Sequence, residues 1–470
     1  MKRILSTLLL TAMLTACGTG TATTTLDAVS DDANTADVSV SGDEAADPEP
    51  EVLTKEDYPD FVLPEATDTL TVYSTEMLSV TLNPALNIFK KMYPEVEVTS
   101  KILSDVEYEE LIRTEIPAGR GPDLLFSHGD DLPDVYKTMS SGIFTDLNPY
   151  FFYDDEFNPE NYFTGIMDSG LYGNIRYFVP VSCWLPLIAT SEEILAEEGI
   201  EPDAFSTLEG IQNACEIYHI NHPDNLPLAD SGLSAEAILR TFFEKCGLQF
   251  IDYQTNTVVM DYDAMKIIAD IAKMYYDAGR TQPGMDLYIE TDVGNHNCLF
   301  NGTIQSLNGL FWSGYYYAEE LMNQNYLVYT YPDAEGGSTA KVVSFAGIPT
   351  NTKNQLNAWR LMKILLSEEI QCGSNGSLPY LSLGSPVLKN GMRTFIENEV
   401  NMIYGSPDGV PAEVIDEYIS LAENIDRAVL TPPIIQRYYL LEMKPYLTGK
   451  RTFDECYENL KNTIELYKDE

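Results

Sequence analysis

Basic side chains and histidine are scarce in this sequence of 470 residues. It contains 28 Lys or Arg against 73 Asp or Glu, with four His, and its formal net charge at pH 7 is −45. Proteins that bind nucleic acid or an anionic membrane face use patches of Lys and Arg. The composition therefore argues against both kinds of partner, but it does not choose between neutral and cationic small ligands.

The sequence patterns of common catalytic sites are also missing. The chain has no G-x-S-x-G, no H-E-x-x-H and no phosphate-binding G-x-x-x-x-G-K. His219 and His222 lie at an expected helix end before Pro223, where exposed histidine is ordinary. A glycosidase needs two facing carboxylates, and with so many acidic residues such pairs arise by chance. The sequence therefore gives catalysis little support: we expect no catalytic residue, metal or cofactor, and a hydrolase is left as an alternative.

Cysteine occurs seven times but never as a C-x-x-C pair. Apart from Cys17, the cysteines are widely spaced: Cys183, Cys215, Cys246, Cys298, Cys372 and Cys456. Six cysteines outside the cytoplasm permit disulfides, but their pairing cannot be derived from sequence. A chain of this length buries a core without cross-links. We therefore expect buried thiols, or at most one disulfide, and no zinc site.

Residues 1–17, MKRILSTLLLTAMLTAC, resemble the leader of a bacterial lipoprotein. Lys2 and Arg3 precede an apolar run that is shorter than the roughly 20 residues of a membrane-spanning helix. LTAC, ending at Cys17, resembles a lipobox. We expect a signal peptide over 1–16 and a lipidated Cys17 that holds the protein at the extracellular face of the cell membrane. The alternative is an ordinary signal peptide with a cysteine there by chance.

The segment that follows is acidic and poor in apolar residues up to about residue 67. Such a composition buries too little apolar surface to offset the entropy of ordering the chain. We therefore expect residues 17–67 to form a lipidated, disordered tether.

The remaining residues, 68–470, are too many for one ordinary core and predict two lobes. Strands are expected at 70–75, 96–102 and 123–127. Helices are expected between them, the first with Asn83 as its N-cap and Pro84 at its first position. This alternation is typical of a parallel sheet, whose ligands lie beyond the carboxyl ends of the strands.

Four further segments resemble those of the extracellular solute-binding proteins of ABC importers, family 1, which include the maltose-binding protein. They are GPDLLFSHGDDLPDVYKTMSSGIFTDLNPYF, NIRYFVPVSCWLPLIATSEEIL, CLFNGTIQSLNGLFW and LNAWRLMKILLSEEIQ. The third lacks the methionine usual in that family. The resemblance implies an α/β, two-lobed periplasmic-binding-protein type II fold, with a mostly parallel sheet flanked by helices in each lobe. It also implies a monomer that closes over a small ligand and delivers it to the transmembrane subunits of an ABC permease.

Carried onto this chain, the resemblance implies lobe boundaries and ligand residues. The first lobe is expected at 68–182 and 308–343, and the second at 183–307 and 344–470. Pro180 and Pro186 are expected to end the pairing of the crossing strand that carries Trp184. The expected ligand residues are an aromatic set that stacks on a sugar ring and a polar set that binds its hydroxyls: Trp184, Phe311, Trp312, Tyr438, Glu76, Ser127, Asp130 and Asp131. His128, Arg437 and Tyr439 are further candidates, and Trp359 is assigned to a lobe core by its helical spacing.

Three functions compete at this point. The first is a carbohydrate-binding receptor for an ABC importer. The second keeps the fold and changes the ligand to a polyamine, or to ferric iron held by Tyr315, Tyr316 and Tyr317. The third is a surface-anchored hydrolase or adhesin.

Overall fold

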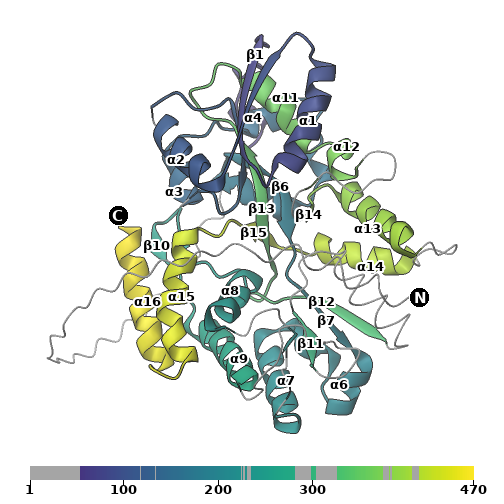
Figure 1. The fold of residues 1–470 in the computed structure, drawn as a ribbon, viewed down its shortest axis with the longest axis vertical. Coiled ribbons are helices and arrows are strands. Elements are labelled where there is room, and N and C mark those ends of the chain that lie inside the picture. The colour runs from purple at the N-terminus through teal and green to yellow at the C-terminus, as the bar shows by residue number, and fades with distance from the viewer. Residues whose placement is uncertain are drawn as a thin grey trace. The chain divides into compact units, whose positions relative to one another are not determined.

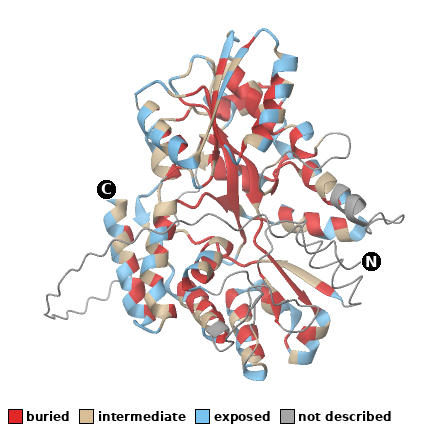
Figure 2. Ribbon diagram, in the orientation of Figure 1, coloured by how far each residue is buried: buried red, intermediate tan, exposed pale blue. Residues whose placement is uncertain are grey.

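The computed structural model describes residues 53–116, 118–132, 134–223, 225, 228–229, 234–280, 298–302, 325–373, 381, 384–404 and 412–469. They belong to one compact unit, Pro50–Glu470, and their apolar side chains form two cores. Figure 1 shows the elements, and Figure 2 shows the buried residues running through them. Several expected features lie outside the described residues: the leader with Cys17, residues 18–52, Phe311, Trp312 and the three tyrosines at 315–317.

The first core surrounds a sheet with the strand order β14-β6-β13-β3-β1-β2, in which β15 also pairs with β13. β1, β2 and β3 are parallel to one another, as the sequence predicts, whereas β13 runs antiparallel to β3 and to β6. The strands of this sheet are β1 (Thr69–Thr75), β2 (Glu97–Leu103), β3 (Leu124–His128), β6 (Phe178–Trp184), β13 (Thr339–Gly347), β14 (Ser385–Pro386) and β15 (Arg427–Val429). A separate hairpin consists of β4 (Leu171–Tyr172) and β5 (Ile175–Arg176).

The helices around this sheet come from both halves of the chain. They are η1 (Lys55–Asp57), α1 (Ser79–Met92), α2 (Asp105–Glu115), α3 (Val135–Ser140), α4 (Asn148–Tyr153), η2 (Pro159–Asn161), α5 (Thr164–Met167), η3 (Asp168–Gly170), α11 (Gln355–Leu365), α12 (Glu368–Gln371), α13 (Lys389–Tyr404) and α14 (Ala412–Glu423). Trp359 on α11 is fully buried in the first core, which confirms its assignment from helical spacing.

The second core lies among helices and a smaller sheet with the order β12-β7-β11-β8. The strands are β7 (Leu187–Ser191), β8 (Leu228–Ala229), β11 (Phe300–Asn301) and β12 (Tyr326–Thr330), with a separate pair β9 (Ile251–Asp252) and β10 (Thr257–Val258). The helices are α6 (Glu192–Glu198), η4 (Pro202–Ser206), α7 (Leu208–Asn221), α8 (Ala235–Lys245), α9 (Tyr262–Arg280), α15 (Pro433–Leu447) and α16 (Phe453–Lys468). β12 and β11 both run antiparallel to β7, and β11 runs parallel to β8.

Three local expectations are corrected by the structure. α1 begins at Ser79, so Asn83 is not its N-cap and Pro84 lies inside the helix. Thr81 and Leu82, which precede Pro84, are buried. Their burial stabilises the first turn of the helix and offsets the backbone hydrogen bond that Pro84 cannot make. Pro180 does not interrupt β6. On the side of β6 that faces β14, β14 pairs only with Ser182 and Cys183. The backbone N–H that Pro180 lacks is therefore not needed for pairing with β14.

The third correction concerns the expected tether, whose last part is folded onto the first lobe. Tyr58 donates its hydroxyl to Asp146 Oδ2 at 2.6 Å. The ring of Phe61 packs edge-on against Tyr150, with 5.2 Å between centroids. These aromatic contacts bury apolar area and stabilise the folded segment. The prediction of disorder was based on the average composition of residues 17–67, which is acidic and does not show the few aromatic residues at the end of the segment.

Within the described residues, the chain passes between the two lobes three times, at residues 185–187, 331–338 and 430–432, and Figure 1 shows the strands β6, β13 and β15 side by side where it does so. The packing corrects the expected boundaries. Residues 344–430, expected in the second lobe, contribute most of their buried side chains to the first core, whereas Tyr331, expected in the first lobe, belongs to the second core. The boundaries differ because β13 and β15, two strands from the second half of the chain, belong to the sheet of the first lobe.

Cys183, Cys215, Cys246, Cys298, Cys372 and Cys456 are buried thiols outside any disulfide, in agreement with the sequence expectation. Burial raises the pKa of the Cys183 and Cys215 thiols to about 12, so these two are poor nucleophiles near neutral pH. Within the described residues, no helix is both long and apolar enough to cross a bilayer.

Candidate functional site

The lobes meet along a seam between β13 and α8, to which the loop after β3, the end of β6 and the start of α15 each contribute a side chain. Lys341 lies opposite Trp184 in the register of β13 and β6. Its Nζ lies 5.2 Å from the centroid of the Trp184 ring. The same Nζ is 3.0 Å from Glu244 Oε1 on α8 and 3.5 Å from Asp130 Oδ1 in the loop after β3. We call these four side chains the Lys341 cluster.

Lys341 is charged and almost entirely buried. Its side chain is 5% exposed, compared with 14% for Glu244 and 45% for Asp130. Burial by itself lowers the pKa of a lysine, but the two carboxylates more than compensate and the pKa is raised. Gln436, on α15, donates from Nε2 to the same Oε1 of Glu244 at 3.1 Å. The cluster is therefore an ammonium ion held by both lobes.

The loop after β3 depends on a glycine. Gly129 donates its backbone N–H to the carbonyl of Val343 at 2.7 Å. A Cβ on Gly129 would lie 2.7 Å from the carbonyl oxygen of Val342 and 3.2 Å from Leu430. Only glycine lets the loop lie this close to β13, and this position brings Asp130 to Lys341.

Asp131 in this loop and His128 at the end of β3 have pKa values shifted toward their neutral forms. Burial raises the pKa of Asp131 to about 7, although its carboxylate accepts the backbone N–H of His128 at 2.6 Å. Burial also lowers the pKa of His128, against the opposing effect of Asp130. Near neutral pH the Asp131 carboxyl is present in both forms, so it can donate as well as accept a hydrogen bond.

A second group of side chains joins the lobes, which we call the Asp134 cluster: Asp134, Tyr136 and Lys137 of the first lobe with Tyr253 and Tyr467 of the second. Asp134 is buried and is the N-cap of α3. Its Oδ2 accepts the hydroxyl of Tyr253 at 2.9 Å and that of Tyr467 at 2.7 Å. The rings of Tyr136 and Tyr253 are stacked with 4.8 Å between centroids. Burial and the nearby Asp134 raise the pKa of Tyr253, which keeps it a neutral hydrogen-bond donor.

A cavity of about 420 Å³ opens beside the Asp134 cluster. Side chains of both lobes line it, namely Lys137, Ser140 and Tyr172 from the first and Ile251, Tyr253, Gln254, Asn256 and Lys468 from the second. Aromatic faces, amides, a hydroxyl and ammonium groups thus surround one space. This is the chemistry that recognises a polyhydroxylated ring.

The structure places the predicted ligand residues unequally. Trp184 and Asp130 belong to the Lys341 cluster, with Asp131 beside it. Glu76 is exposed after β1. Ser127 is buried in the first lobe, where its hydroxyl is hydrogen-bonded to that of Tyr108.

On α15, the residue that reaches the Lys341 cluster is Gln436. Tyr438 packs edge-on against Tyr467 of the Asp134 cluster, with 5.7 Å between centroids. Tyr439 is buried in the second core and Arg437 is exposed.

Sequence reasoning missed Lys341, Glu244 and Asp134. A lysine within the apolar run of β13, TAKVVSFAG, is a signal of a buried cation and could have been noticed. Asp134 precedes a short helical pattern and has the form of an N-cap. Glu244 has no local signal, because the end of an amphipathic helix ordinarily carries such a charge.

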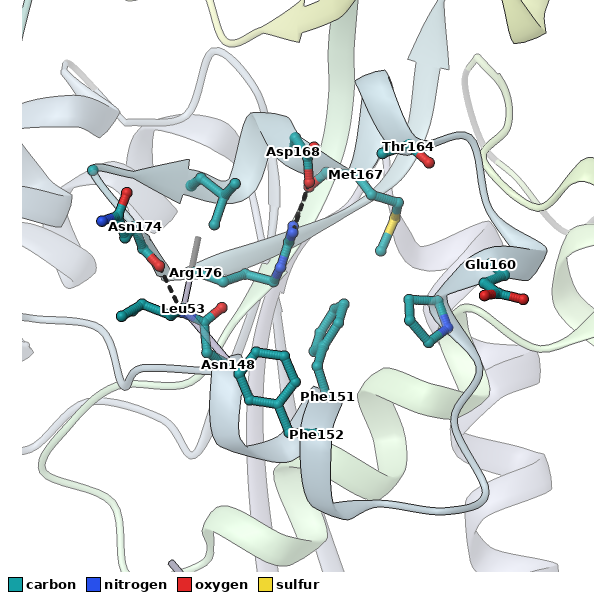
Figure 3. Close-up of a pocket in the computed structure, with 13 residues that line it drawn as sticks. Leu53, Asn148, Phe151, Phe152, Glu160, Thr164, Met167, Asp168, Asn174 and Arg176 are labelled. Carbon is teal, nitrogen blue, oxygen red and sulfur yellow. Dashed lines mark hydrogen bonds and ion pairs between the residues drawn. The ribbon is translucent and has the colours of Figure 1, made fainter. Parts of the chain in front are cut away.

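Another cavity, of about 460 Å³, lies within the first lobe (Figure 3). It is mostly apolar, with Phe151, Phe152 and Met167 in its wall. Its buried Arg176 is already paired with Asp168 Oδ1 at 2.8 Å and stacked on Phe151. It shares no lining residue with the Lys341 cluster or the Asp134 cluster, so we do not assign it to the seam.

No family model and no curated relative matches the chain. Solved structures do resemble it. The sugar-binding protein MalE from Xanthomonas citri has a TM-score of 0.60 at 15% identity, over 85% of this chain and 97% of that one. The ABC substrate-binding protein Lmo0181 from Listeria monocytogenes, in complex with cycloalternan, has 0.53 at 13% identity, over 85% and 98%. The cyclic alpha-maltosyl-1,6-maltose binding protein from Arthrobacter globiformis has 0.55 at 13% identity, over 86% and 99%.

These similarities confirm the predicted fold class. The chain has the two-lobed α/β fold of solute-binding proteins.

Proposed function

We propose that this protein is an extracellular solute-binding receptor that captures a carbohydrate or oligosaccharide between its lobes and delivers it to an ABC importer. The observation that carries the proposal is the seam, where half-buried aromatic rings lie among hydroxyl, amide and carboxyl groups of both lobes. Two solved structures of the same fold that are named as sugar-binding proteins, and a third that holds cycloalternan, support this ligand class. In this proposal the protein acts by binding alone, as a monomer that docks on the permease subunits.

A neutral ligand suits the seam better than a polyamine. A polyamine needs ammonium sites made of carboxylates and an aromatic face. In the Lys341 cluster that position already holds the ammonium of Lys341. The ferric-iron alternative depends on Tyr315, Tyr316 and Tyr317, which lie outside the described residues.

A thermal-shift screen of residues 53–470 against mono- and oligosaccharides, polyamines and Fe³⁺ tests the proposal. A ligand at 100 times its dissociation constant adds about 2.7 kcal/mol to the free energy of unfolding, so we expect a sugar to raise the melting temperature clearly. The same sugar should lower the radius of gyration in small-angle scattering, because closure brings the lobes together.

Stabilisation by a polyamine or Fe³⁺ and by no sugar would contradict the sugar receptor and indicate a receptor for that other ligand. Release of a cleaved product from the stabilising sugar, followed by chromatography, would instead support the hydrolase alternative.

We also propose that the mature protein is held at the extracellular face of the membrane by a lipid on Cys17. Support comes from the lipobox-like LTAC and the short apolar run before it. The full-length Cys17→Ser variant should leave the membrane fraction and keep wild-type sugar affinity. A variant that is processed normally and stays in the membrane fraction would contradict the anchor and leave the sugar receptor untouched.

A further inference from the structure

The Lys341 cluster has the construction of a ligand site for an ammonium ion. Two carboxylates from different lobes and one aromatic face converge on a single nitrogen, at 3.0 Å, 3.5 Å and 5.2 Å. Organic cations are recognised by such combinations of ring face and carboxylate. Here the cation is part of the chain, and its side chain is more than nine-tenths buried.

Between Trp184, Glu244 and Lys341, the described residues leave no room for a second cation. The gap bounded by Trp184, Glu244 and Lys341 holds about 10 Å³, which is about one water-sized probe. Lys245 lines the same gap and narrows it further. Glu244 is further occupied by the amide of Gln436. An incoming ammonium ion would have to displace the ammonium group of Lys341. The displaced group would stay close to the ligand, because it is attached to the chain, and would repel it.

We propose that Lys341 determines the charge specificity of the seam: its ammonium fills an ammonium-binding site formed by Trp184, Asp130 and Glu244, and so excludes amine ligands from it. That the site faces the captured ligand rests on the proposed function, whereas the ammonium site itself does not. Removing the lysine side chain uncovers a site for a small alkylammonium ion.

The Lys341→Ala variant tests this directly, since n-propylammonium has the atoms that the substitution removes. We expect tens of millimolar n-propylammonium to raise the melting temperature of Lys341→Ala by several degrees and to leave the wild type unchanged. n-Propanol and sodium chloride at the same concentrations should stabilise neither protein. Lys341→Met, which keeps the apolar stem without the charge, should not respond to the amine.

A matched variant locates the response. Adding Glu244→Gln to Lys341→Ala should abolish the amine-induced shift, because the closer carboxylate is gone. If Lys341→Ala does not accumulate as folded protein, the refolding yield with n-propylammonium, compared with n-propanol, measures the same rescue.

Equal stabilisation of the wild type by the amine, or a folded Lys341→Ala that does not respond to it, would overturn the inference. The sugar screen is a separate readout. Amine rescue without sugar binding would support the ammonium site and contradict the sugar receptor, and the reverse result would contradict only the role of Lys341.

Discussion

Replacing Trp184 by alanine is expected to weaken ligand binding by about thirtyfold or more, with little change in the melting temperature of the unliganded protein. A buried aromatic that stacks on a ligand is often a hot spot whose truncation costs at least about 2 kcal/mol, and each 1.4 kcal/mol is about a factor of ten in affinity. Trp184 is half-buried and belongs to neither hydrophobic core, whereas its neighbours Cys183 and Leu185 belong to the first. Its indole therefore contributes little to core packing.

Titration calorimetry with the stabilising sugar and thermal unfolding, both on the same Trp184→Ala preparation, provide the measurement. Trp184→Phe is the matched control, since it keeps an aromatic face and should retain most of the affinity. A large fall in melting temperature with normal affinity would show that Trp184 is a packing residue, and the seam would then need another stacking ring, such as that of Tyr253.

Replacing Trp359 by alanine should have the opposite effect: a loss of about 3–5 kcal/mol in the free energy of unfolding, the usual cost of truncating a core aromatic. Trp359 is fully buried on α11, among the rings of Tyr150, Phe151 and Phe157. Its Nε1 donates to Asp154 Oδ2 at 2.6 Å. The variant loses this packing and leaves a buried carboxylate oxygen with one donor fewer.

Urea unfolding of the wild type, Trp359→Ala and Trp359→Phe separates the two contributions. The phenylalanine variant keeps much of the ring packing and loses the N–H donor, so it should lose only about 1–3 kcal/mol. Lys363 Nζ, 2.7 Å from the same Asp154 oxygen, remains to neutralise the carboxylate. Folded Trp359→Ala should bind the sugar normally. Wild-type stability, or a loss of affinity larger than that of Trp184→Ala, would contradict the assignment of Trp359 to the core.

Local sequence patterns were enough to predict several features of this fold. The strands around 70–75, 96–102 and 123–127 form a parallel sheet, because each apolar run is short, rich in strand-forming residues and separated from the next by a helix. The burial of Trp359 followed from its place on an apolar helix face. The acidic loop after β3 was predicted as a site because strand ends meet at one edge of such a sheet.

Which distant residues meet depends instead on long-range packing. Asp130, Glu244 and Lys341 are more than ninety positions apart, and nothing local relates them. The lobe boundaries depended on β13 and β15 returning to the first sheet, a pairing that gains its energy from long-range contacts. On α15, the rotation of the helix against α8 buries Tyr439 and brings Gln436 to Glu244. Packing between the two helices sets that rotation, so it cannot be predicted from the residue pattern of one helix.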